Sequence, residues 1–77
     1  MMTLRYAILD ACLLGRALHA VGIEGLRELP CEALDNPTKE AARHIATEFE
    51  KRTADPRLDG YQLSRMWEVI SGLRLAS

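Results

Sequence analysis

Glycine and proline residues interrupt this chain at a few places and leave three long segments between them. Gly22 and Gly25 follow the first segment, Pro30 comes soon after, and the stretches LDNPTKE and TADPRLDG stand before the second and third segments. Each long segment repeats its apolar residues every three or four positions, as a helix does, and no run alternates as a strand does. The sequence therefore predicts an all-α fold, a compact bundle of three main helices plus one short helix or turn, in a single helical domain over residues 1–77.

The first predicted helix, residues 3–21, is apolar nearly all round, with Gly22 as its C-terminal cap. Its main apolar face is formed by Leu4, Ala7, Ile8, Ala11, Leu14, Gly15, Leu18 and Val21. A helix of this kind is buried on more than one side, and two shorter helices offer little surface to cover it. We therefore predict that a second apolar strip mediates self-association or partner binding, and this strip contains Leu9, Leu13, Ala17 and Ala20.

The rest of the chain predicts one or two short helical turns and two further helices. The turns lie within residues 22–36, with apolar side chains pointing inward: Ile23, Leu26, Leu29 and Leu34. The second long helix is expected to start at Asn36 or Asp35 as its cap, with Pro37 in the first turn, and to end near Arg52.

The third long helix is expected to start near Asp59, which together with Gln62 resembles a capping box. Only four residues of the chain are aromatic, so the core must consist mostly of aliphatic side chains, with Trp67 as its largest member. The predicted core is Leu4, Ile8, Leu18, Ile45, Phe49, Leu63, Trp67 and Ile70.

Two cysteines and two histidines raise the question of a metal site or a nucleophile. Structural zinc sites pair their ligands closely, whereas Cys12, His19, Cys31 and His44 are spread over more than thirty positions, so we expect no metal. Arg16, four residues after Cys12, lies where it could lower the pKa of that thiol. A Cys12–Cys31 disulfide is possible in geometry, but we expect reduced thiols because the predicted compartment is the cytoplasm.

The composition excludes several functions. The net charge is −1 and no apolar run approaches the roughly 18 residues that cross a bilayer, which argues against a membrane segment and a basic nucleic-acid footprint. No nucleophile with its base, carboxylate pair or phosphate-binding loop can be assembled, so we expect neither an enzyme nor a cofactor.

The expected function is therefore protein–protein interaction. The sequence favours a small non-enzymatic protein, of the adaptor, chaperone, immunity or inhibitor type, that binds a larger protein partner and forms a homodimer. The alternative is a helix-turn-helix-like nucleic-acid-binding regulator, whose contacts would come from Arg57, Gln62 and Arg65.

Overall fold

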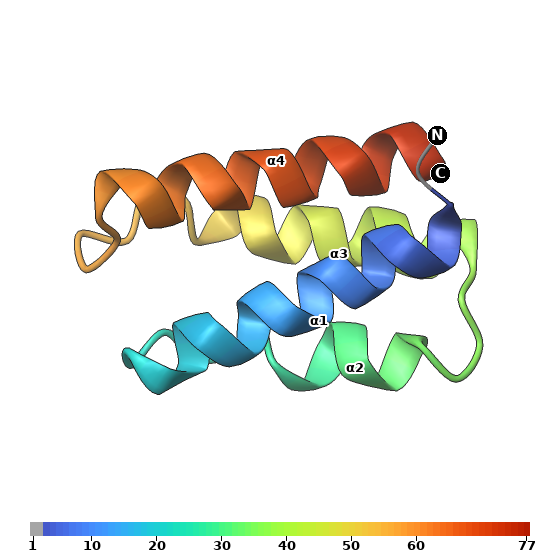
Figure 1. Ribbon diagram of the computed structural model, residues 1–77, viewed down its shortest axis with the longest axis horizontal. Helices are drawn as coiled ribbons and strands as arrows, with labels where there is room; N and C mark the ends of the chain where they lie inside the picture. Colours follow the sequence, from blue (N-terminus) through green and yellow to red (C-terminus); the bar gives the residue numbers. More distant parts are fainter. Residues whose placement is uncertain (1–2) are drawn as a thin grey trace.

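A computed structural model describes residues 3–77 and contains four helices (Figure 1). They are α1 (Leu4–Ala20), the short α2 (Glu28–Ala33), α3 (Lys39–Lys51) and α4 (Gly60–Ala76). Helices α3 and α4 lie antiparallel, α1 crosses them, and α2 packs mainly on α1 (Figure 1). The predicted all-α bundle of three main helices and one short helix is confirmed, and no strand occurs among the described residues.

Both ends of α1 are fixed by local hydrogen bonds. At the start, Oγ1 of Thr3 accepts a hydrogen bond from the backbone N–H of Tyr6 at 3.1 Å. At the end, the N–H of Gly22 donates to His19 O and the N–H of Ile23 donates to Leu18 O, both at 3.0 Å. This is a Schellman motif, which requires the positive φ of 98° found at Gly22, and it confirms the predicted glycine cap.

The start of α3 differs from the prediction. Thr38, not Asn36 or Asp35, is the N-cap: its backbone is extended and its Oγ1 accepts a hydrogen bond from the N–H of Ala41 at 3.0 Å. Pro37 consequently precedes the cap instead of lying in the first turn. Several residues in this stretch can act as caps, and only the path of the chain from α2 selects Thr38.

The start of α4 is as predicted. The N–H of Gln62 donates to Oδ1 of Asp59 at 2.7 Å, and Oε1 of Gln62 accepts from the N–H of Asp59 at 3.0 Å. These two bonds form the capping box and satisfy two backbone donors at the helix end.

The core lies where α1, α3 and α4 meet, and five of its predicted members are fully buried: Ile8, Leu18, Ile45, Phe49 and Ile70. The residues in and around α2 that were predicted to point inward also pack here. Ile23 and Leu26, before α2, are buried, whereas Leu29 within it and Leu34 after it are partly buried against the cluster.

The prediction that Trp67 is the largest core anchor is wrong, because its side chain is 43% exposed. The buried side of α4 is centred on Met66, Val69, Ile70 and Leu73, and Trp67 follows Met66 by one residue, about 100° further around the helix. Leu4 and Leu63 are only partly buried. Of the three core residues predicted on α4, only Ile70 is fully buried, since a broad apolar face does not reveal which of its edges faces solvent.

Candidate functional site

A disulfide bond joins Cys12 of α1 to Cys31 of α2, with a Cα–Cα distance of 5.0 Å. The expectation of two reduced thiols is therefore wrong. It rested on an assumed compartment, whereas α2 packs over the side of α1 that carries Cys12 and brings the two cysteines together. Cys12 is only 5% exposed, since α2 covers it.

Gly15 allows the chain before α2 to approach α1 closely. A Cβ atom at this position would lie 2.1 Å from the backbone oxygen of Leu26, well inside van der Waals contact. Gly15 lies about one helical turn beyond Cys12, so the close backbone contact and the disulfide hold the same side of α1. A glycine in the middle of a helix is the sequence signal for such a contact.

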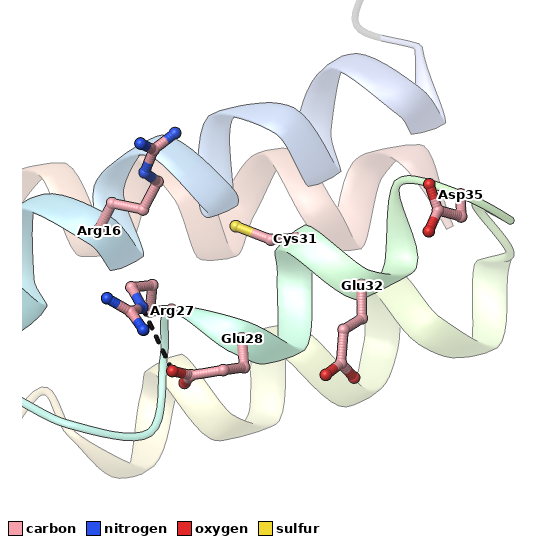
Figure 2. A pocket seen from close by; sticks show the side chains of 6 residues that line it. All are labelled: Arg16, Arg27, Glu28, Cys31, Glu32 and Asp35. Atoms are coloured by element: carbon pink, nitrogen blue, oxygen red, sulfur yellow. Dashed lines mark hydrogen bonds and ion pairs between the residues drawn. The ribbon is translucent and has the colours of Figure 1, made fainter.

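Beside the disulfide, α1 and α2 enclose a shallow hollow of about 510 Å³ (Figure 2). The sulfur of Cys31 points from α2 toward α1, with Arg16 on α1 (Figure 2). The hollow is lined by six residues, which are Arg16, Arg27, Glu28, Cys31, Glu32 and Asp35. It combines one cysteine of the disulfide, which is partly buried, with charged groups of both signs.

The charges in this hollow are only partly paired. Nε of Arg27 donates to Oε1 of Glu28 at 3.2 Å. The pKa of Glu28 is lowered, first by a hydrogen bond from its own backbone N–H and then by Arg27, the effect of both being opposed by some desolvation. Within residues 3–77, the guanidinium of Arg16 makes no hydrogen bond or ion pair.

The histidines do not form a site with the cysteines. His19, near the end of α1, is partly buried and its Nδ1 has no hydrogen-bond partner, whereas His44 is exposed on α3. Across residues 3–77, no three His, Cys, Asp or Glu side chains converge in a way that could hold a metal ion.

The predicted interaction strip lies on the outer side of α1, opposite its core face. Leu9 is 40% exposed and Leu13 54%, and Ala17 and Ala20 are also exposed. Tyr6, 56% exposed, extends the same line toward the start of the helix. The structure thus leaves all four predicted residues together and open to solvent.

A second shallow hollow, of about 650 Å³, lies on the outer surface of α4 and reaches α1 at Asp10. Nη2 of Arg65 donates to Oδ1 of Asp10 at 2.8 Å, and this hydrogen bond is the main cause of the raised pKa of Arg65. Trp67 and Leu75 contribute the large apolar side chains of the lining. The sequence prediction had placed Trp67 in the core and therefore missed this surface.

The three residues proposed for nucleic-acid contact all have partners within the protein. Nη1 of Arg57 donates to Gly22 O at 2.7 Å and its Nη2 donates to Oδ2 of Asp55 at 2.7 Å, and this pairing lowers the pKa of Asp55 to about 2. Gln62 belongs to the α4 capping box, and Arg65 is paired with Asp10.

The connection between α3 and α4 also differs from a helix-turn-helix. It covers residues 52–59, longer than the three or four residues that join the helices of that motif. These contacts and this length favour structural roles for Arg57, Gln62 and Arg65.

Comparison with protein-family models, with curated proteins and with solved structures gave no match. None of the helices described over residues 3–77 is long and apolar enough to cross a membrane.

Proposed function

We propose that this chain is a small, non-enzymatic protein-binding protein that pairs with a second copy of itself through the outer strip of α1 and, as a dimer, binds a larger protein. The observation that carries this proposal is the exposed apolar line formed by Tyr6, Leu9, Leu13, Ala17 and Ala20 on a helix whose opposite side is fully buried. Large apolar side chains gathered along one exposed helix face are typical of interaction surfaces.

The order of residues in the strip suits a symmetric antiparallel pair. A two-fold axis at Leu13 would bring Leu9 of one copy opposite Ala17 of the other, since these lie four residues before and after Leu13. Tyr6 and Ala20 lie seven residues before and after it and would be opposed in the same way. Tyr6 and Leu9 would then each face an alanine, while the two copies of Leu13 would meet at the axis, and this arrangement allows two helices to pack closely.

The expected affinity of this pairing is moderate. Stable interfaces bury about 800 Å² on each partner, and one side of a single helix provides an interface at the small end of that range. We therefore expect dissociation in the micromolar range, so that dimer and monomer can both be observed by dilution.

The outer surface of α4 is the proposed contact for the larger partner. Tyr61 is 75% exposed, Trp67 43% and Leu75 87%, and the last two line the hollow beside the Arg65–Asp10 ion pair. Exposed aromatic side chains next to an arginine are the residue types that contribute most to binding energy in protein interfaces.

The disulfide bond bears on the predicted cytoplasmic location. Disulfide bonds persist mainly in oxidising compartments, so the Cys12–Cys31 bond favours a location outside the reducing cytosol.

The test is sedimentation equilibrium of wild type and Leu13→Glu over about 1–300 µM, a range that brackets micromolar dissociation. Leu13→Glu places two like charges at the two-fold axis, so it should be monomeric throughout while its far-UV circular dichroism stays that of the wild type. Leu75→Glu is the matched control: it makes the same substitution at an exposed leucine of α4 and should still dimerise.

A wild type that is monomeric at every concentration contradicts the pairing. A Leu13→Glu variant that unfolds shows instead that the strip belongs to the core. Trp67, the single tryptophan, reports separately on the α4 surface through its fluorescence, and a Trp67→Ala variant should lose the larger partner but keep the dimer.

A further inference from the structure

We propose that the Cys12–Cys31 disulfide is a thiol-exchange site, which a small anionic thiol enters through the hollow between α1 and α2 and attacks at Sγ of Cys31. The two sulfurs belong to residues with different surroundings. Cys12 is 5% exposed and lies among the buried residues of α1, whereas Cys31 is partly buried and lines the hollow. Access decides which sulfur of a disulfide is attacked, so exchange is directed to Cys31.

The exchange proceeds in two balanced steps. In the first, the incoming thiolate forms a bond to Sγ of Cys31, the Cys12–Cys31 bond breaks, and its electron pair leaves on Sγ of Cys12 as a thiolate. In the second step, the thiolate of another small molecule attacks the sulfur of the small molecule bound to Cys31. This attack releases Cys31 as a thiolate and the two small molecules as their disulfide. The protein disulfide gains two electrons, and two small thiols are oxidised.

We assign to Arg16 the stabilisation of both negative charges in the first step, which are those of the incoming thiolate and of the departing Cys12 thiolate. Arg16 lies four residues after Cys12, one turn along α1 (Figure 2). It is one of the residues that line the hollow, and it makes no hydrogen bond or ion pair with another side chain of residues 3–77. A nearby guanidinium stabilises a departing thiolate, and a thiolate with a lower pKa leaves faster. The same positive charge attracts an anionic thiol toward Cys31.

The other charged residues of the hollow limit the preference for anionic thiols to small molecules. Arg27 is paired with Glu28, while Glu32 lies further along α2 and Asp35 in the turn that follows it (Figure 2). A large, multiply charged thiol would meet these two carboxylates, whereas a compact one beside Arg16 would not. Mercaptoacetate is therefore the probe of choice, with cysteamine as its cationic counterpart of similar size.

The site of attack is tested on the folded wild-type protein. After brief exposure to mercaptoacetate, the reaction is quenched with acid, free thiols are alkylated, and peptides are mapped by mass spectrometry. The expected product carries mercaptoacetate on Cys31 and the alkyl group on Cys12. An adduct on Cys12 overturns the proposal, as does exchange that occurs only at the rate of global unfolding.

Single-cysteine variants provide a second measurement of access. In Cys12→Ala the remaining Cys31 thiol should react with a disulfide reagent at least about tenfold faster than the Cys12 thiol of Cys31→Ala, because reactivity follows exposure and thiolate content. Equal rates in two folded variants contradict the assignment.

Arg16→Gln tests the charge. The ratio of the mercaptoacetate rate to the cysteamine rate is compared between wild type and variant, because this comparison cancels the intrinsic reactivity of each thiol. The ratio should be about two- to fivefold lower in the variant at low salt. The matched control is Arg43→Gln, an exposed arginine of α3 outside the hollow, which should leave the ratio unchanged. An unchanged ratio in Arg16→Gln removes Arg16 from the proposal.

This inference is independent of the proposed dimer, since Cys12 is buried beneath α2 and the outer strip of α1 is exposed. The thiol-exchange experiments can therefore contradict this inference while sedimentation supports the dimer, and sedimentation can contradict the dimer while the exchange experiments support this inference.

Discussion

The α1–α2 pair and the α3–α4 pair are held together in different ways. Helices α3 and α4 are long enough to share a large part of the core, including Phe49, Met66 and Leu73, and each starts at a side-chain cap. By contrast, α2 has six residues, no side-chain N-cap bond and one buried residue, Pro30. Its attachment to α1 adds a covalent bond and a close backbone contact at Gly15.

This difference shows how a short element is retained in a small domain. A helix of fewer than about 12 residues is marginal in water, and a chain of this length buries little surface beyond its main core. For α2, the disulfide and the close contact at Gly15 replace part of the stabilisation that packing supplies to α3 and α4. The α1–α2 pair is thus expected to open locally when the disulfide or the Gly15 contact is removed, while α3 and α4 should open only when the whole domain unfolds.

The largest effect on this comparison should come from removal of the disulfide. Cys12→Ala with Cys31→Ala should lower the free energy of unfolding by about 3 kcal/mol, because the bond closes a loop of about 20 residues in the unfolded chain. Urea denaturation measures the loss. Hydrogen exchange should show the greatest loss of protection in α2, and equal loss in α3 and α4 would contradict the local role of the bond.

The close contact at Gly15 should have the next largest effect. Gly15→Ala forces the backbone of Leu26 away from α1 and should cost about 1–3 kcal/mol, the range observed for overpacking. Gly60→Ala is the control, since a Cβ there meets nothing within 4 Å, and it should change stability by less than about 1 kcal/mol. A Gly15→Ala variant as stable as Gly60→Ala would show that the α1–α2 contact is loose.

The smallest effect concerns the connection between α3 and α4, where Arg57 ties Asp55 to the backbone of Gly22. The pKa of Asp55 is lowered from 3.8 to about 2, mainly by the side-chain hydrogen bond from Arg57. Its contribution to stability is therefore present above the unfolded value and is lost as the pH falls through the folded value. The Tm of Asp55→Asn should lie slightly below that of the wild type at pH 7, and the two should converge near pH 2. A difference that persists at pH 2 would place the effect elsewhere than in this carboxylate.

Local sequence patterns determined the helices and several of their ends. The spacing of apolar residues predicted three main helices, Gly22 predicted the end of α1, and Asp59 with Gln62 predicted the start of α4. These features depend on hydrogen bonds and side chains within a few residues of one another, so they can be inferred from short stretches of sequence. The outer strip of α1 was found in the same way, because helical periodicity alone separates it from the core face.

Only the tertiary structure decided which sides of the helices meet. The pairing of Cys12 with Cys31 and the Arg65–Asp10 contact join residues far apart in sequence, and no local pattern specifies them. The outward position of Trp67 has the same origin, since a broad apolar stripe can turn either edge to solvent. The physical reason is that periodicity fixes the angle between residues on one helix, while the rotation of that helix against its neighbours depends on how all the side chains fill the shared core.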